Sequence, residues 1–188
     1  RDYRLALAED IGETIESALE DGEDSLVGVA QMLSNPDLSP GERIPMAMNV
    51  VEASELLDHA HVFDVEGAKI DAIVQGDGSV PVTVERLPEK LRERARRRAV
   101  AVGSVVADGD EVRALAAVPM RGKEGEVTGF VAAHLPLGPI QKRVSFVAEY
   151  RISSSENPVY VVDRRLRMIA HPDKQKALGL QPAPDHAL

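Results

Sequence analysis

The sequence predicts an α+β fold in which a long helix precedes an antiparallel sheet. An amphipathic helical pattern runs from Tyr3 to Leu33. Short apolar segments separated by turn residues follow it, as is typical of an antiparallel sheet. A strand that ends in Asp, a tight turn and a returning strand occur twice, at Asp64 and at Asp163. The second copy indicates that one complete module is followed by the beginning of another.

The composition is that of a folded chain of about one domain, or one and a half. The 188 residues are 44% hydrophobic and 28% charged, so the chain has enough apolar surface to bury. The net charge of -9 disfavours nucleic acids and anionic membrane surfaces as partners. Because there is no cysteine, disulfides, thiolate metal sites and cysteine nucleophiles are excluded.

Four helices are expected from apolar spacing and from residues that start or end helices. Asn35-Pro36 ends the first helix, and Ser39 followed by Pro40 is typical of the start of the second. The third contains a run of arginines, and the fourth follows a Pro-Leu-Gly-Pro entry. The expected helices cover residues 3–33, 40–57, 87–100 and 136–150.

Seven strands are expected, of which the first two form a hairpin with Gly67 in its turn. Residues 75–81 are expected to form a loop and residues 151–158 a polar linker. The polar, proline-containing tail at 171–188 is expected to be held only by contacts to the first module. The expected strands cover residues 59–64, 69–74, 102–106, 112–119, 127–135, 159–163 and 166–170.

These elements predict three parts of the chain. Residues 1–57 form the long helix and the second helix, residues 58–150 a complete sheet-containing lobe, and residues 151–188 a linker with an incomplete second lobe. Too few residues follow the second Asp turn to complete another unit of the same size.

The order of elements resembles the PAS-like fold of extracytoplasmic Cache sensor domains. Phe63 to Gly67 reads Phe-Asp-x-x-Gly, as at the end of the first strand pair in that family. Ala116 to Met120 followed by Gly125 to Val131 resembles the family's two-strand stretch, and Val159 to Asp173 resembles the first hairpin of a second lobe. The resemblance covers nearly the whole chain and points to the double-Cache type, with a complete membrane-distal lobe and the start of a membrane-proximal one.

The resemblance implies a small-ligand sensor domain in the periplasmic or extracellular part of an inner-membrane protein, such as a histidine kinase, chemoreceptor or cyclase. Such a fragment is no enzyme, uses no cofactor, and transmits ligand binding through its long helix. The chain begins at Arg1 without a signal-peptide pattern, so we expect an internal piece of a longer protein. The longest uncharged stretch, Val127 to Gln141, is shorter than the ~20 apolar residues of a membrane span, so anchoring segments are expected outside this chain.

Two departures from the family pattern are visible. Double-Cache sensors for amino acids carry an Arg-x-Trp-Tyr stretch before the third strand, whereas this chain has Arg92-Glu93-Arg94-Ala95. Amino-acid recognition of that type is therefore not expected. The second Asp turn reads Asp163-Arg164-Arg165-Leu166 and lacks the usual glycine.

The candidate ligand-binding residues are His61, His134 and Arg113. His59 and His61 share one face of a predicted strand, and with Asp58 or Asp64 they fit either a hydrogen-bonded histidine pair or a metal site. The pair is favoured because no third ligand has suitable spacing, and no metal is predicted.

Arg113 and His134 lie on alanine-rich strands, where small side chains leave room either for a ligand or for close packing of a helix. The arginine run from Arg86 to Arg98 fits either an anion site or a solvated helix with ion pairs, and the helix is favoured. His171-Pro172-Asp173 has no nucleophile in a Gly-x-Ser-x-Gly context to serve, and no phosphate-binding loop is present, so catalysis is not expected.

Two other functions fit the same elements. One is a ligand-free PAS-like module for dimerisation or protein interaction. The other is a cytoplasmic PAS or GAF domain. A membrane-spanning apolar segment on either side of this fragment in the parent protein would exclude it. For the sensor domain itself, the apolar stripe of the first helix also suits pairing with a second copy, so a homodimer through this helix is expected.

Overall fold

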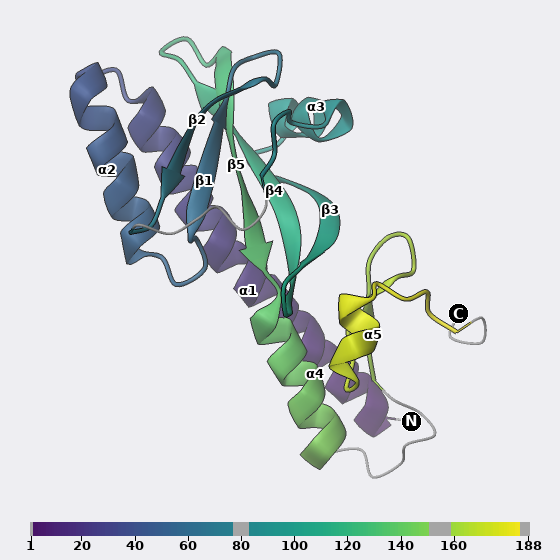
Figure 1. Cartoon of the computed structure of the whole chain (residues 1–188). Helices are drawn as coiled ribbons and strands as arrows, with labels where there is room; N and C mark the ends of the chain where they lie inside the picture. Colours follow the sequence, from purple (N-terminus) through teal and green to yellow (C-terminus); the bar gives the residue numbers. More distant parts are fainter. Residues whose placement is uncertain (1, 77–82, 151–158, 185–188) are drawn as a thin grey trace. The chain divides into compact units, whose positions relative to one another are not determined.

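The computed structural model describes residues 2–76, 83–150 and 159–184 (Figure 1). The elements, in chain order, are α1 (Asp2–Ser34), α2 (Pro40–Ala53), β1 (His59–Phe63), β2 (Lys69–Val74), α3 (Glu89–Arg97), β3 (Ala101–Asp108), β4 (Glu111–Arg121), β5 (Val127–Pro136), α4 (Gly138–Tyr150), β6 (Val161–Val162), β7 (Met168–Ala170) and α5 (Lys174–Leu178). The predicted α+β class is confirmed.

The chain divides into two compact units. The sheet unit contains Asp21–Ser104 and Ala114–Leu135. The tail unit contains Arg1–Glu20, Val105–Arg113 and Pro136–Leu188. The boundaries expected from the sequence, at 57/58 and 150/151, stay a prediction.

A five-stranded sheet with the strand order β2-β1-β5-β4-β3 is the centre of the fold. β1 pairs antiparallel with both β2 and β5, so that His61 lies opposite Ala72 on one side and Ala132 on the other. β1 is therefore an inner strand although it comes first in the sequence. All five of its residues are buried.

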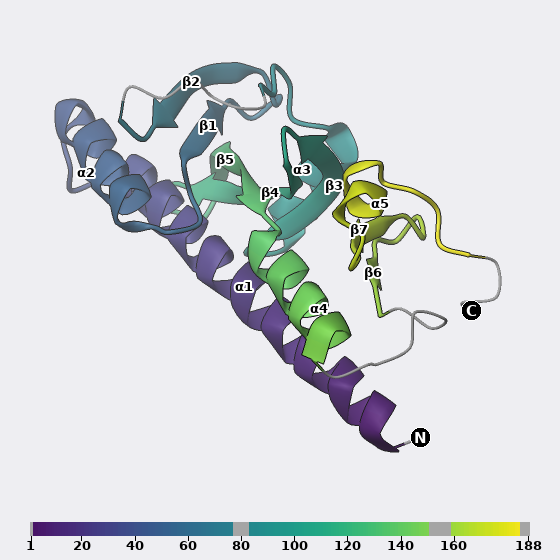
Figure 2. The same ribbon diagram turned by 60° about the horizontal axis from the view of Figure 1, so that its bottom comes forward.

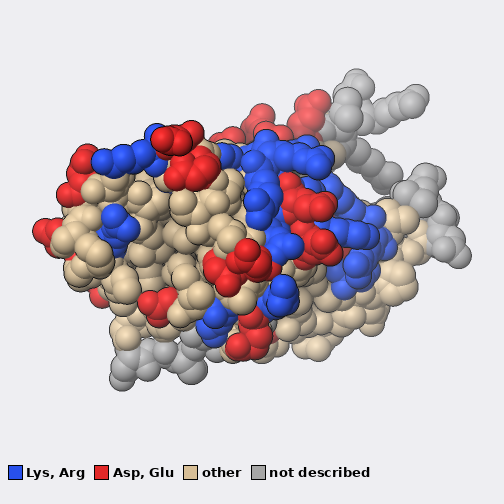
Figure 3. All heavy atoms as spheres, turned by 90° about the horizontal axis from the view of Figure 1, so that it is seen from above, with Lys and Arg blue, Asp and Glu red and all other residues tan. Residues whose placement is uncertain are grey.

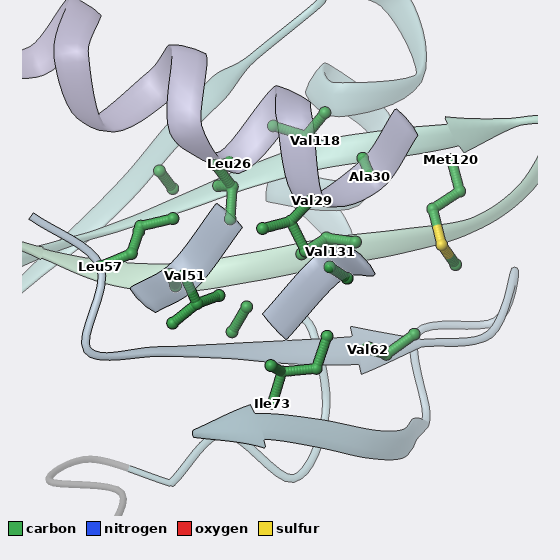
Figure 4. Close-up of a cluster of buried hydrophobic side chains, with 14 of the residues drawn as sticks. Leu26, Val29, Ala30, Val51, Leu57, Val62, Ile73, Val118, Met120 and Val131 are labelled. Carbon is green, nitrogen blue, oxygen red and sulfur yellow. The ribbon is translucent and has the colours of Figure 1, made fainter. Parts of the chain in front are cut away.

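One face of the sheet packs against α1 and α2, which lie side by side on it in both ribbon views (Figures 1 and 2). Alternate residues of β1, Ala60 and Val62, belong to this core. Val62 lies there together with Val131 of β5 (Figure 4). Leu26 and Val29 of α1, residues of α2 and further residues of the sheet also belong to it. Burying each of the Val and Leu side chains contributes about 1.5–3 kcal/mol to folding.

The opposite face of the sheet is covered by α3 and is called the α3 face below. Leu91 and Ala95 of α3 pack there against Phe63 of β1 and Phe130 of β5. The same strands thus supply both cores through the period-two alternation of their side chains.

The second and third helices are shorter than the sequence predicted. α2 ends at Ala53 instead of about Leu57, because the Ser54 hydroxyl accepts hydrogen bonds from the Leu56 and Leu57 backbone N–H groups, each at 3.2 Å. These bonds form a turn that competes with the helix. The predicted start of α2 is confirmed, because a capping box forms there between Ser39 and Glu42.

α3 covers Glu89–Arg97, within the expected range of 87–100. Arg98 has the extended backbone conformation, which leads directly into β3 at Ala101. The expected loop at 75–81 lies mostly outside the described residues, and the expected linker at 151–158 lies wholly outside them.

The C-terminal tail differs from the prediction. Instead of being held only through the first module, it pairs with its own hairpin: Met168 N–H donates to the Gln181 carbonyl at 2.7 Å, and Ala183 N–H donates to Leu166 at 2.8 Å. Residues 174–178 form α5, whose N-cap Asp173 accepts from the Gln175 N–H. The tail unit therefore has local structure of its own.

The two Asp turns share a pair of hydrogen bonds at equivalent positions. At the first, Asp64 N–H donates to the Ala68 carbonyl at 2.9 Å, and Ala68 N–H donates to Asp64 Oδ1 at 2.8 Å. At the second, Asp163 N–H donates to the Arg167 carbonyl at 2.9 Å, and Arg167 N–H donates to Asp163 Oδ1 at 3.0 Å. The predicted internal repeat is confirmed at this level.

Asp163 carries an additional ion pair with Arg167, whose Nη2 lies 2.6 Å from Asp163 Oδ2. Burial alone would raise the pKa of the Asp163 carboxyl, but hydrogen bonds from Arg167 and Arg165 and the Arg167 charge together lower that pKa. Because the native pKa is depressed, this carboxylate stabilises the turn above its unfolded pKa, and the effect is lost as pH falls through the native value.

The two turns differ in their fourth residue. Gly67 has φ +82°, and Leu166 has φ +58° at the equivalent position. The left-handed region is unfavourable for a residue with a Cβ and natural for glycine. Leu166 is also 41% exposed, so its side chain contributes little burial.

We expect Leu166→Gly to raise the free energy of unfolding by up to about 1 kcal/mol, because it removes the left-handed strain. The matched variant Gly67→Ala is expected to lower it, since a Cβ there lies 3.2 Å from the Leu87 carbonyl oxygen. Urea denaturation of both variants provides the measurement. A destabilised Leu166→Gly protein contradicts the interpretation.

Candidate functional site

Three histidines lie together on the α3 face and are called the histidine cluster: His59, His61 and His134. His59 and His61 are two residues apart in β1, so their side chains lie on the same face of the sheet. Continuing the printed β1–β5 register by two residues places His134 of β5 opposite His59. The ring centroids of His59 and His61 are 5.0 Å apart, and those of His59 and His134 are 6.1 Å apart.

The cluster is almost completely removed from solvent. His59 and His61 are 0% exposed and His134 is 3% exposed. Histidine is usually only partly buried, and a buried polar group normally has hydrogen-bond partners.

His59 is bonded on one side of its ring only. Its Nδ1 lies 2.5 Å from Asp58 Oδ1, and the Asp58 side chain is 39% exposed. Its Nε2 is buried and has no hydrogen-bond partner among the described residues. Such an atom loses its hydration without compensation, at a cost of about 1–3 kcal/mol.

Aromatic and small side chains surround the cluster. Phe63 follows His61 along β1, with its ring centroid 6.2 Å from that of His61. Phe130 and Ala132 precede His134 on β5, and all three alternate onto the α3 face. The face thus combines a row of rings with the small side chain of Ala132.

Two of the three predicted ligand residues, His61 and His134, are therefore brought together, and His59 joins them. The sequence pointed to His59 only as a possible partner of His61. Asp64 does not lie with them, because its carboxylate shapes the β1–β2 turn. Within residues 2–76, 83–150 and 159–184, no group of three or more His, Asp or Glu side chains has an arrangement that suits a metal ion.

Arg113, the third predicted ligand residue, belongs to the tail unit. Its Nε lies 3.2 Å from Asp108 Oδ2, and its Nη2 lies 3.4 Å from Glu111 Oε2. The guanidinium therefore neutralises two carboxylates at the β3–β4 turn, and its side chain is 12% exposed. A role in ligand binding stays a prediction.

The arginine run has a structural role at the β1–β2 turn. Arg86 and Arg92 both donate to the Glu66 carbonyl, and Arg96 donates to the Val65 carbonyl at 2.8 Å. The Arg96 guanidinium also lies 5.5 Å from the centre of the Phe130 ring. In Figure 3, Lys and Arg side chains are interleaved with Asp and Glu on the face seen from above.

The tail unit contains a groove of about 610 Å³ between α4, α5 and the start of β4. Its size is within the range of ordinary ligand sites. Phe146 of α4, which is 43% exposed, lines it, and Lys174 pairs with Asp110 at its edge at 3.4 Å. The groove was not predicted from the sequence. It depends on where α5 lies relative to α4, and no local sequence pattern determines that.

Gln141, which lines the groove, connects α4 to the tail. Its Nε2 donates to the His171 carbonyl at 2.8 Å, and its Oε1 accepts from the His171 N–H at 3.2 Å. Burial, and then the nearby Lys176 charge, lowers the pKa of the His171 imidazole, with a partial offset from Asp173. His171 is thereby favoured in its neutral form, whose Nδ1 accepts from the Asp173 N–H.

The fold is similar to that of several chemoreceptor ligand-binding domains. The domain of the Pseudomonas aeruginosa amino acid chemoreceptor PctC, in complex with GABA, aligns with a TM-score of 0.65 and 14% identity, over 95% of this chain and 78% of that one. The Campylobacter jejuni chemoreceptor Tlp3 domain with L-valine gives 0.61 and 14%, over 97% and 73%. The Pseudomonas fluorescens CtaA domain with L-isoleucine gives 0.58 and 15%, over 90% and 67%.

No family model matches the chain, and no curated protein matches it at a significant level. The structural similarity confirms the predicted fold, that of double-Cache ligand-binding domains, over nearly the whole chain. In the part of the chain that the structure describes, no helix combines the length and the apolar character needed to cross a bilayer.

We expect Arg113→Met to lower the free energy of unfolding by about 1–2 kcal/mol, because two partly buried carboxylates lose their partner. Asp108→Asn in the same background is expected to recover part of the loss, since it removes one of the unpaired charges. Urea denaturation of the single and double variants measures the coupling. An unchanged stability of Arg113→Met contradicts a structural role for the two ion pairs.

Proposed function

We propose that the chain is the non-catalytic, extracytoplasmic sensor domain of a membrane-bound signalling protein, and that it binds a small molecule at the histidine cluster. The observation that carries the proposal is the buried Nε2 of His59, which has no hydrogen-bond partner among the described residues. A ligand that bonds to this atom would offset its desolvation. His61 and His134 are its proposed neighbours in the site.

The similar structures support a sensor of this kind. Those of PctC, Tlp3 and CtaA hold GABA, L-valine and L-isoleucine, respectively. An extracellular ligand-binding receptor from Desulfohalobium retbaense also aligns, with a TM-score of 0.57 and 16% identity, over 93% of this chain and 32% of that one. We place this domain in the periplasm or outside the cell, with membrane anchors outside the present sequence.

The proposed signal passes through the sheet to α1. A ligand shifts a conformational equilibrium only by binding one state more tightly than the other. Binding at the α3 face changes the packing of β1 and β5, whose other faces contact Leu26 and Val29 of α1. The output module of the parent is proposed to be a histidine kinase, a chemoreceptor or a cyclase.

A thermal-shift screen tests the proposal with amino acids, carboxylates, amines, alcohols, sugars, nucleobases and divalent metals. A compound present at 100 times its dissociation constant is expected to add about 2.7 kcal/mol to the stability of the folded state. His59→Asn is expected to lose the effect. His171→Gln, in the tail unit, is the control that keeps it.

If no compound raises the midpoint of a cooperatively melting protein, the sensor proposal is wrong. The ligand-free dimerisation module then becomes the preferred function.

We also propose a homodimer through the N-terminal helix. Ile11 of α1 is buried, while Ile15 and Leu19 on the same stripe are only partly buried. Analytical ultracentrifugation is expected to show a dimer, and Ile15→Glu is expected to weaken it by placing a charge in the contact. A monomer at high concentration contradicts this proposal.

A further inference from the structure

We infer that His171 is a pH-sensitive latch: its neutral imidazole holds the start of α5 against α4, and acidification releases it. The inference goes beyond the proposed function, because it concerns the tail unit by itself and needs no ligand at the histidine cluster. The proton is the signal, and the groove between α4 and α5 is the part of the tail unit that changes.

The first step is the protonation state that the geometry requires. The Asp173 backbone N–H donates to His171 Nδ1 at 2.9 Å. A backbone N–H is only a donor, so this nitrogen carries its lone pair, and the ring is neutral with its hydrogen on Nε2. A hydrogen added to Nδ1 would point at the hydrogen of the Asp173 N–H, and that contact is repulsive.

The second step is the connection of this bond to α5. Asp173 is the N-cap of α5, and its Oδ1 accepts from the Gln175 N–H at 3.1 Å. The Asp173 carbonyl oxygen also lies 3.3 Å from His171 Nδ1. A protonated ring uses this oxygen only by exchanging the Asp173 N–H for it, and the exchange displaces the residue that caps the helix.

The third step is the attachment of the same residue to α4. The Gln141 side chain bonds both backbone groups of His171, with Nε2 2.8 Å from the carbonyl oxygen and Oε1 3.2 Å from the nitrogen. His171 therefore joins α4 to the start of α5. The chain beyond α5 is anchored separately, by the bond from the Met168 N–H to the Gln181 carbonyl. Release at His171 thus frees the start of α5 and leaves its end in place.

The latch controls one wall of the groove. α5 contributes Lys174 and Ala177 to the lining of the groove, and α4 contributes Gln141 and Phe146. Lys174 also pairs with Asp110 at 3.4 Å, but both side chains are exposed, so this ion pair holds α5 only weakly. Movement of the start of α5 therefore changes the width of the groove and the surroundings of Phe146.

The groups around His171 favour its neutral form. The residue is 5% exposed, and burial is the largest cause that lowers the pKa of its imidazole. The Lys176 charge lowers this pKa further, while the Asp173 carbonyl and carboxylate offset part of the effect. Among the described residues, the partners from other elements are the Gln141 amide and Tyr160, whose ring centroid is 6.0 Å from that of His171. Neither is charged near neutral pH.

The direction of the pH effect follows from the lowered pKa of the latched imidazole. A released ring takes up a proton at its ordinary pKa of about 6.5, whereas the latched ring takes it up only at lower pH. The latch is therefore complete above about pH 6.5 and is lost as the pH falls below that value. One coupled proton changes the ratio of released to latched molecules by at most about tenfold per pH unit.

The experiment places one tryptophan in the groove, since the chain has none of its own. Phe146→Trp introduces it at a position that lines the groove and is 43% exposed. The emission maximum of this tryptophan is followed from about pH 8 to pH 5. A shift is expected below about pH 6.5, because the start of α5 moves and the surroundings of the indole change.

His171→Asn, added to Phe146→Trp, is the matched control. The asparagine Oδ1 accepts a hydrogen bond from the N–H two residues later, as His171 Nδ1 does, but it does not titrate. The double variant is therefore expected to keep the emission maximum of the latched state throughout the pH range. An equal shift in both proteins overturns the inference, and so does the absence of a shift in the single variant.

A second measurement, two-bond ¹H–¹⁵N NMR of the histidine rings, uses the unaltered protein, and His171→Asn assigns the His171 signal. It is expected to show a non-protonated Nδ1 at about pH 7.5 and backbone amide signals of residues 173–178 that move with the same midpoint as the ring. A protonated Nδ1 at that pH, or a ring that titrates while these amides stay unchanged, overturns the inference. Neither result concerns the histidine cluster, so the sensor proposal is tested separately.

Discussion

The packing of α1 and α2 against one face of the sheet is the constraint on which the rest of the structure depends. Side chains alternate along a strand, so burying Ala60 and Val62 of β1 under these helices directs His59 and His61 to the α3 face. A slip of one residue would exchange the two sets and place imidazoles in the aliphatic core. The hydrophobic cost of that exchange fixes the register and, with it, the histidine cluster.

Local patterns explain why most of the fold was predictable. The 3.6-residue stripe of α1, the Ser39-Pro40 start of α2 and the glycine turn of the first hairpin act within a few residues of the chain. The end of α2 was missed because Ser54 competes with the helix through side-chain bonds that a periodicity does not reveal. The pairing of the tail with its own hairpin was missed because Gln181 returns after α5 to the strand at Met168.

The site was predictable only where it depends on the alternation of side chains along a single strand. That His59 and His61 share a face follows from their spacing, but the approach of His134 depends on the pairing of β1 with β5, which are far apart in the sequence. For Arg113 the strand was predictable, but the carboxylates of Asp108 and Glu111 beside its guanidinium were not. Long-range pairing and side-chain partners are the information that a single sequence does not carry.

The position of the histidine cluster also limits how a bound molecule can act. The cluster lies on the sheet face opposite α1, so α1 responds only if β1 and β5 move. Protein interiors are close-packed, and a strand displaced from one side must shift the side chains on its other side. Leu26 and Val29 of α1 are among those neighbours, and the same helix continues without interruption from the sheet unit into the tail unit. Under the proposed function, α1 is therefore the element expected to carry a change at a buried ring away from the sheet unit.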